Sequence, residues 1–361
     1  MTTALRVQGR IGGGEASAST RLLIGGAAAG LCVATFLSLS IGATGITLAS
    51  LPRVLSAMLT GRYEADVARE QLVLIDIRLP RMLLGMFVGA SLAVAGAMMQ
   101  GMFRNPLADP GLVGVSSGAA LAAVATIALG NSLAAPWIKT FGAYALPLAA
   151  FVGGIATTMI LVSIVSREGQ MAVSTLLLAG VALAALNGAL MGLIAYSSDD
   201  RELRDLTLWM LGSLSGASWP KVFAVIPFAL LVALVLPRLI RGLNGLLLGE
   251  AEAFHLGIDV ERTKRAVVLV TSAAVGAAVA VSGILGFVGI VVPHVVRLLA
   301  GPDHRIVLPA SALMGATLVL AADILARMLL RPAELPLGVV MAILGAPVFL
   351  HMVVKRGMAG G

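Results

Sequence analysis

Few ionisable side chains interrupt the apolar runs of this 361-residue chain, and each of them needs a chemical reason. Asp323 and Arg327 stand four residues apart in one such run. This spacing places both on one face of a helix, so the two side chains can form an ion pair. A charge within a bilayer is costly and often functional. Two interpretations therefore remain: a local ion pair near a helix end, or an arginine that offers its charge to a partner at the membrane surface.

Arg204 is a second candidate for chemistry. It lies in the segment DDRELRDLTLW, which begins at Asp199 and leads toward the next apolar stretch. Charges of both signs in such a segment favour a solvated helix face. The alternative is that Arg204 lies near the mouth of a pathway and meets an anionic substrate there.

The sequence contains no pattern typical of an enzyme. It has no GxxxxGK[ST] phosphate loop and no GxGxxG motif after a strand. Its four histidines stand far apart, and its one cysteine, Cys32, lies within an apolar run, so neither a metal site nor an internal disulfide is predicted. We expect no catalytic residue, no metal and no bound cofactor in this chain. The energy source would then be an ATPase partner or an ion gradient.

The composition identifies the elements that must position these side chains. Hydrophobic residues make up 59% of the chain and charged residues 12%, whereas about a quarter of a soluble domain is charged. With 42 glycines and 4% aromatic residues, the chain is typical of closely packed helices and not of a lipid-facing β-barrel. The formal charge of +7 is explained by basic loops at the cytoplasmic membrane surface, so no nucleic acid is expected. The sequence predicts an all-α, polytopic membrane protein.

About ten apolar runs are candidates for crossing the bilayer. The seventh and eighth are nearly continuous, and hydropathy alone could merge them. A polar loop over 44–77 is predicted to form an amphipathic surface helix, and two other polar segments cover 197–220 and 241–265. The candidate crossings lie near residues 22–43, 82–101, 112–130, 144–165, 174–196, 222–240, 266–284, 286–300, 307–326 and 337–354.

An even number of crossings places both termini on one side of the membrane. If residues 1–21 are a cytoplasmic tail, the cytoplasmic segments hold fourteen basic and eight acidic residues, a net charge of +6. The other segments hold eleven basic and ten acidic residues, a net charge of +1. This difference has the sign of the positive-inside rule. We therefore expect one transmembrane domain over 22–356 and a cytoplasmic C-terminal tail over 357–361.

The segment from Arg78 to Gly118 joins two polar boundaries through one apolar helix. Arg78 and Arg81 precede a run without charge from Met82 to Met99, which is about long enough to cross the hydrocarbon core. The run is rich in glycine, alanine and serine, which allow neighbouring helices to approach closely. A polar connection broken by proline then leads into the next apolar run.

This segment and five others resemble the FecCD-type permease subunits of ABC importers for haem, iron-siderophores and cobalamin. The resemblance covers most of the chain from Arg78 onward, in the family's order, and the first 77 residues carry little of it. The segments are RLPRMLLGMFVGASLAVAGAMMQGMFRNPLADPGLVGVSSGAA at 78–120, LLLAGVAL at 176–183, LWMLGSLSGASW at 208–219, LGEAEAFHLGID at 248–259, GFVGIVVPHVVRLLAGPDHR at 286–305 and PAELPLGVVMAILGAPVFL at 332–350.

The resemblance implies a type II ABC importer permease with ten spans, in the inner membrane of a bacterium. It further implies a homodimer with the translocation pathway on its two-fold axis. Two ATP-binding subunits, which hold ATP and Mg²⁺, would bind on the cytoplasmic side, and a periplasmic solute-binding protein would bind on the other side.

The resemblance also implies roles for individual residues. Arg78, Arg81 and Arg327 match arginines that form salt bridges to glutamates of the binding protein. The cytoplasmic segment 249–265 matches the coupling helices that seat on each ATPase, and a cytoplasmic gate lies between two short segments. The implied coupling residues are Glu250, Ala251, Glu252, Phe254, His255, Leu256 and Gly257, and the implied gate residues are Asn105, Pro106, Leu107, Ser174 and Thr175.

The segment DDRELRDLTLWMLGSL resembles the version found in haem permeases, where Arg204 would meet the haem propionates. We therefore expect haem as the cargo, with a ferric siderophore second and cobalamin third. A gradient-driven secondary transporter would need ionisable residues near mid-membrane. A membrane-embedded enzyme would need a cluster of His, Asp, Glu or Cys at one depth. The sequence favours neither of these two alternatives.

Overall fold

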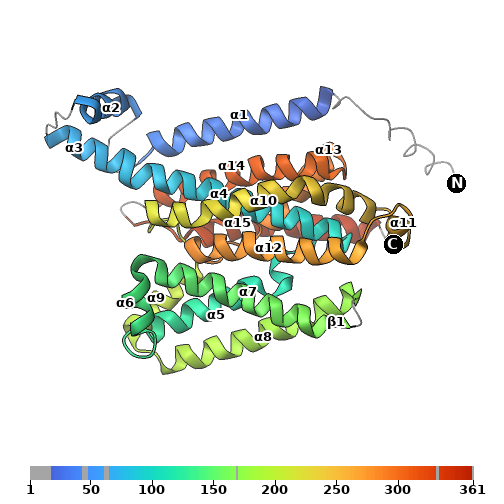
Figure 1. The fold of residues 1–361 in the computed structure, drawn as a ribbon. Coiled ribbons are helices and arrows are strands. Elements are labelled where there is room, and N and C mark those ends of the chain that lie inside the picture. Colours follow the sequence, from blue (N-terminus) through green and yellow to red (C-terminus); the bar gives the residue numbers. More distant parts are fainter. Residues whose placement is uncertain (1–17, 43–47, 61–64, 168–169, 331–332, 360–361) are drawn as a thin grey trace.

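The computed structural model describes residues 18–42, 48–60, 65–167, 170–330 and 333–359. Ten helices lie where the ten apolar runs predicted them (Figure 1). Within the described ranges, seven helical segments are long and apolar enough to cross a membrane. The apolar stretches of α5, α13 and α15 are shorter, and that of α15 covers Leu337–Met352. The ten helices are α1 Ala18–Ser40, α4 Leu79–Phe103, α5 Val115–Ala128, α7 Ala145–Val165, α8 Val173–Ser197, α10 Trp219–Leu246, α12 Val260–Ser282, α13 Val288–Ala300, α14 His304–Met328 and α15 Leu337–Ala359.

Short elements cover the two ends of the helix bundle (Figure 1). At one end, here called the α9 end, lie α2 Leu51–Thr60, α3 Ala65–Gln71, α6 Ala135–Phe141 and α9 Asp200–Met210. At the other, the α11 end, lie α11 Glu250–His255 and a hairpin of two short antiparallel strands. The remaining short elements are η2 Leu48–Ser50, η3 Leu72–Arg78, η4 Pro110–Val113, η5 Gly142–Tyr144, β1 Ser166–Arg167 and β2 Gln170–Met171.

The prediction of one amphipathic helix over 44–77 is wrong in detail. The structure has two short helices there, and α3 continues through the π-helix η3 into α4 without a break. The tail predicted over 1–21 lies mostly outside the described residues, which begin at Ala18. The side chains of residues 355–361 are also outside the described part of the chain, so the tail predicted over 357–361 stays a prediction.

Two left-handed residues separate α12 from α13, the pair that hydropathy could have merged. α12 ends at Gly283, whose φ is 69°, and α13 begins after Phe287, whose φ is 67°. Glycine adopts such a φ without steric cost, whereas phenylalanine does so rarely. The chain therefore turns within a few residues and forms two helices, as the sequence interpretation of ten runs required.

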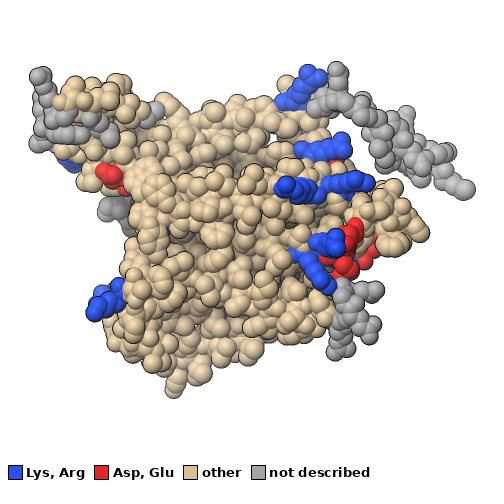
Figure 2. All heavy atoms as spheres, in the orientation of Figure 1, with Lys and Arg blue, Asp and Glu red and all other residues tan. Residues whose placement is uncertain are grey.

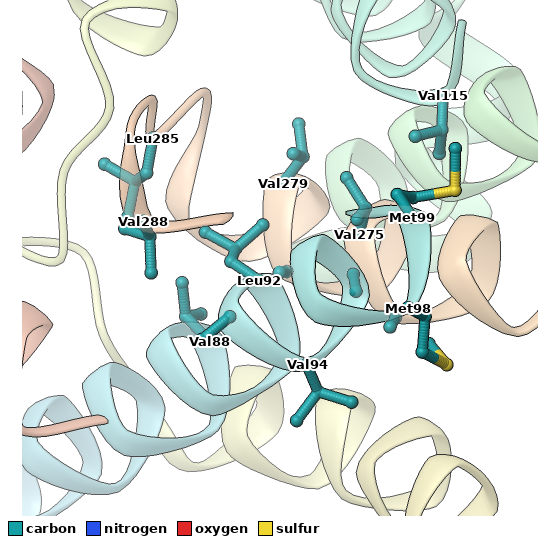
Figure 3. Packing of buried hydrophobic residues seen from close by; sticks show 14 of the residues in the cluster. Val88, Leu92, Val94, Met98, Met99, Val115, Val275, Val279, Leu285 and Val288 are labelled. Carbon is teal, nitrogen blue, oxygen red and sulfur yellow. The ribbon is translucent and has the colours of Figure 1, made fainter. Parts of the chain in front are cut away.

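Two helices form the centre of the bundle. In the most apolar 18 residues of each helical segment, 83% of the residues are buried in α12 and 78% in the segment containing α4. The corresponding share is 11% in both α1 and α8. Figure 3 shows Val88 and Leu92 of α4 beside Val279 of α12 and Val288 of α13. The outer helices instead expose large apolar side chains, and on the face in Figure 2 the Lys and Arg side chains lie toward the two ends. A band of apolar surface between charged ends is what a bilayer requires.

Close contacts between backbones explain the small residues of the 82–99 run. A Cβ on Gly96 of α4 would overlap the carbonyl group of Gly289 in α13, and a Cβ on Gly89 would overlap that of Gly315 in α14. Lipid provides no hydrophobic drive between helices, so such close packing supplies much of their attraction. The prediction that small residues bring α4 against its neighbours is confirmed.

Candidate functional site

The three predicted docking arginines lie together at the α9 end, and each is bonded within the chain. Arg81 is 8% exposed and pairs with two carboxylates. Its Nε donates to Asp323 Oδ1 at 3.0 Å, and its Nη1 and Nη2 donate to the two oxygens of Glu334 at 3.1 and 3.0 Å. The Arg81 fork thus grips Glu334 with two parallel bonds, the strongest geometry for this pair.

Arg327 shares the same buried carboxylate. Its Nε lies 3.1 Å from Asp323 Oδ2, so the ion pair predicted from the spacing of four residues is confirmed. Its Nη1 donates to the carbonyl of Ile41 at 3.0 Å, just beyond the end of α1. Asp323 is 1% exposed and therefore holds two arginines from within the protein.

Arg78 also binds the C-terminal end of α1. Its Nη1 donates to the carbonyls of Leu39 at 2.5 Å and Ser40 at 3.3 Å, and the residue is 5% exposed. Carbonyls at the C-terminus of a helix lack partners within the helix and favour a positive charge. Arg78 and Arg327 together satisfy these groups of α1. The proximity of the three arginines and their burial followed from the tertiary structure and not from the sequence.

Arg204 lies on α9, the short amphipathic helix that covers part of this end. Asp199 caps α9 through the amide of Glu202 at 2.7 Å, and the Glu202 carboxylate accepts from the amide of Asp199. This capping box fixes where the helix starts. Leu206 is buried beneath the helix, while Arg204 is exposed and makes no side-chain hydrogen bond or ion pair with a described residue. Its charge is therefore free to meet a ligand.

The first predicted gate segment follows α4 at the α11 end. Asn105 is exposed and its Oδ1 accepts from the amide of Leu107 at 3.1 Å, while Pro106 and Leu107 are half-buried. Next in the segment, burial raises the pKa of the Asp109 carboxyl, and a hydrogen bond from the amide of Gly111 at 2.7 Å opposes this shift. The segment is thus a tight turn built from its own side chains.

The second predicted gate segment opens α8. Ser174 and Thr175 are exposed in the first turn of the helix, three residues after the end of the β1–β2 hairpin. The structure places both gate segments at the α11 end, and their role as a gate stays a prediction.

The predicted coupling segment forms α11 and the start of α12. Ala253 is fully buried and anchors α11 to the bundle, while Phe254 and Leu256 are 72% and 54% exposed. Gly257, with a φ of 75°, turns the chain, and Asp259 caps α12 through the amide of Arg262. Large apolar side chains at the end of the bundle, among charged residues, are typical of a surface that another protein covers.

A buried lysine that the sequence interpretation missed fastens this segment to β2, the strand that precedes α8. Lys264 of α12 is 3% exposed, and its Nζ lies 2.7 Å from Glu250 and 3.2 Å from Glu261. The same Nζ donates to the carbonyl of Met171 at 3.1 Å, and the Met171 amide donates to Glu261 at 2.8 Å. We call Lys264, Glu250, Glu261 and Met171 the lysine clip.

The sequence did contain a signal for the lysine clip. Lys264 occupies the same helical face as the buried residues Val267, Val268 and Thr271, three, four and seven positions later. A lysine in such a stripe is buried with its helix and needs acceptors from elsewhere in the fold.

Two amide side chains form hydrogen bonds between helices. Gln100 donates to the carbonyl of Ile290 at 3.1 Å, and Asn187 donates to Ser117 at 3.1 Å. These bonds join α4 to α13 and α8 to α5. Gln100 and Asn187 thus each hold two helices together through one amide hydrogen bond.

Comparison with known proteins agrees with this architecture. The model of the FecCD transport family matches residues 30–355. The hemin transport system permease protein HmuU of Yersinia pestis is 46% identical over 290 residues, covering 78% of this chain and 83% of that protein. The cobalamin import system permease protein BtuC of Halobacterium salinarum is 44% identical over 286 residues, covering 79% of this chain and 74% of that protein.

A solved structure shares the fold as well. It is described as an inward-facing conformation of a putative metal-chelate type ABC transporter, and it superposes with a TM-score of 0.78 at 32% identity. The match covers 92% of this chain and 99% of the other. The fold is therefore that of a type II ABC importer permease. The chain belongs to the FecCD transport family and is the transmembrane permease subunit of an ABC importer, whose ATPase is a separate subunit.

Proposed function

We propose that this chain imports haem across the inner membrane of a bacterium, as a homodimer that binds two ATPase subunits and a periplasmic binding protein. ATP and Mg²⁺ are held by the ATPase subunits. The α11 end is cytoplasmic, with both termini on that side, and the α9 end is periplasmic. The excess of basic residues in the segments assigned to the cytoplasm supports this orientation.

The observation that carries the proposal is the exposed apolar surface of α11. Phe254 and Leu256 project from a helix that the bundle holds through Ala253, so they can pack in a cleft of a partner. Glu250 and Glu252 flank them and set the orientation by charge. The other coupling residues, Ala251, His255 and Gly257, are exposed along the same surface. ATP-driven closure of the partner would move α11 and switch the helices between outward-open and inward-open states.

The arginine cluster at the α9 end supports docking of a binding protein in a specific way. Arg81 is bonded to Glu334, whose side chain is 40% exposed. A carboxylate of the binding protein would replace Glu334 on the Arg81 fork, while Arg78 and Arg327 add positive charge beside it. Because Asp323 remains paired, this exchange leaves no buried charge without a partner.

Two features support haem as the cargo. HmuU is a hemin permease, and it is similar to this chain over most of both sequences. Arg204 is exposed on α9 and free to bind a haem propionate, for which its planar guanidinium is suited. Cobalamin is the second candidate because a cobalamin permease is 44% identical. After release from α9, the cargo would pass toward the gate segments around Asn105 and Ser174.

One reconstitution tests the function and the cargo together. The dimer, its ATPase and its binding protein are placed in liposomes, and ATP hydrolysis and uptake are measured with haem, a ferric siderophore and cobalamin. We expect haem to stimulate both activities most. Arg204→Gln should reduce haem uptake, whereas Arg201→Gln, another exposed arginine of α9, should not. Stimulation by cobalamin alone would assign the cargo to the second candidate, and uptake driven by an ion gradient without ATPase would refute the importer mechanism.

A further inference from the structure

An apolar groove lies between α10 and α14, with α4 as its floor. Its volume is about 400 Å³, and it opens on the outer surface of the helix bundle. Most of its wall is aliphatic, and the space results from small side chains, Ala90 on α4, Ala229 and Ala233 on α10, and Ala312 on α14. Larger side chains at these positions would fill the space between α10 and α14, whereas the alanines leave a channel.

The groove has the depth of one membrane leaflet. Along α10 its wall runs from Ala229 to Ile240, which at 1.5 Å per residue is about 17 Å. Half of a bilayer's hydrocarbon core is about 15 Å. On α14 the groove begins with Arg305, one residue after the start of the helix at the α11 end, and reaches Ala312. It therefore extends from this membrane surface to about mid-membrane.

A positive charge stands at the surface end of the groove. Arg305 lines it, is exposed, and makes no side-chain hydrogen bond or ion pair with any residue that the structure describes. The nearby carboxylate of Asp303 is engaged elsewhere, since its Oδ1 accepts from Asn244 at 2.7 Å and from the Arg305 amide at 2.9 Å.

A second arginine lies at the edge of the same opening. Arg241 follows the groove residue Pro237 by four positions, so it is at the border of the same face of α10. Arg241 is also exposed, and its side chain makes no hydrogen bond or ion pair with a described residue. In Figure 2, blue side chains gather near this end of α10 and α14. The groove thus combines an apolar wall of leaflet depth with two free cations at the depth of the lipid headgroups.

We propose that this groove is a binding site for an anionic phospholipid. One acyl chain lies against α4 between the alanines, and the headgroup phosphate binds Arg305 and Arg241. Basic pockets between membrane helices are known to favour anionic headgroups. The lipid belongs to the leaflet at the α11 end, which the orientation proposed above makes the cytoplasmic leaflet. A lipid at this place would join α10, which leads into α11, to α14 and α4 at the centre of the bundle.

Native mass spectrometry of the purified permease dimer in detergent tests this site. Phosphatidylglycerol and phosphatidylcholine with identical acyl chains serve as probes, so that only the headgroup charge differs. We expect phosphatidylglycerol to be retained in preference. Arg305→Gln and Arg241→Gln should each reduce that preference by about five-fold, because one arginine near the surface is worth about that factor. Equal retention of the two lipids by the unaltered chain would overturn the proposal.

Two further variants separate the groove from general surface charge. Arg238→Gln is the matched control, since Arg238 is exposed on the same helix but lies on the side opposite the groove by the helical period. It should leave the preference unchanged, and a loss equal to that of Arg305→Gln would refute a specific site. Ala233→Phe fills the groove from an exposed position and should lower retention of both lipids. Undiminished retention in Ala233→Phe, with an unchanged melting temperature, would show that no acyl chain lies there.

Discussion

Replacing Lys264 with methionine should disconnect the coupling segment from β2, the strand that leads into α8, without removing either element. Methionine keeps most of the length and apolar volume of the lysine stem, so the buried space stays filled. The bonds from Nζ to Glu250, Glu261 and the Met171 carbonyl are lost together. The first turn of α8, which carries Ser174 and Thr175, would then no longer follow α11 through the lysine clip.

The cost in stability can be bounded from the same contacts. Hydrogen bonds to charged groups contribute about 1.5–3 kcal/mol each. Glu250 and Glu261 are 46% and 29% exposed and can turn to water, so the contribution of each ion pair is strongly reduced. The variant also no longer buries an ammonium group. We therefore expect the free energy of unfolding to fall by only about 2 kcal/mol, which leaves the variant folded.

The assay compares cargo uptake with ATP hydrolysis in liposomes that contain the complete importer. The ATPase should still bind, since Phe254 and Leu256 are untouched, and ATP hydrolysis should continue. Uptake per ATP hydrolysed should fall several-fold because α8 responds less to movement of α11. The control is Arg262→Gln, a neighbouring substitution at a side chain that is 88% exposed and pairs only with Asp259 among the described residues. Unchanged uptake per ATP in Lys264→Met would refute a mechanical role for the lysine clip.

Three further predictions concern packing, the arginine cluster and the ATPase surface. Gly96→Val should lower the free energy of unfolding by about 3 kcal/mol or prevent folding, because the new side chain overlaps the backbone of Gly289; thermal melting in detergent measures this. Asp323→Leu should cost about 3–5 kcal/mol by leaving two buried arginines facing each other, and the double variant with Arg81→Met should recover much of it. Phe254→Asp should abolish co-purification of the ATPase while leaving the melting temperature unchanged, because this side chain is 72% exposed.

Each of these predictions has an outcome that contradicts it. Gly192→Ala is the control for packing, since a Cβ there meets no atom within 4 Å, and equal melting of both glycine variants would contradict the close contact. If the double variant at Asp323 and Arg81 is no more stable than Asp323→Leu, unpaired charge is not the cause of the loss. If the ATPase co-purifies normally with the Phe254→Asp variant, α11 is not the surface to which the ATPase binds.

The buried arginines also change how the docking role must be tested. Reversing the charge of Arg78 or Arg81 would disrupt bonds inside the chain as well as contacts to a partner. A loss of binding-protein affinity would then be ambiguous. Glu334→Gln avoids this difficulty because its side chain is partly exposed, and it should raise affinity by weakening the internal competitor of the docking carboxylate.

The sequence by itself determined where the helices lie and which of them are apolar. Ten runs of suitable length predicted ten helices, because a segment in lipid must satisfy its own backbone hydrogen bonds. The sequence also predicted local pairs. The Asp323–Arg327 ion pair follows from the helical repeat alone, because residues four apart lie on the same face of a helix. The motifs gave the family, and with it the expectation of an importer permease, which the comparisons confirmed.

Only the tertiary structure decided which faces of these helices meet protein and which meet lipid. Both environments accept the same aliphatic side chains, so hydropathy does not distinguish the central helix α4 from the peripheral helix α8. For the same reason the sequence did not show that Arg81 reaches Asp323, 242 residues away, or that Lys264 reaches the Met171 carbonyl, 93 residues away. Such contacts arise from helices packed side by side. Their partners are fixed by the fold and not by spacing along the chain.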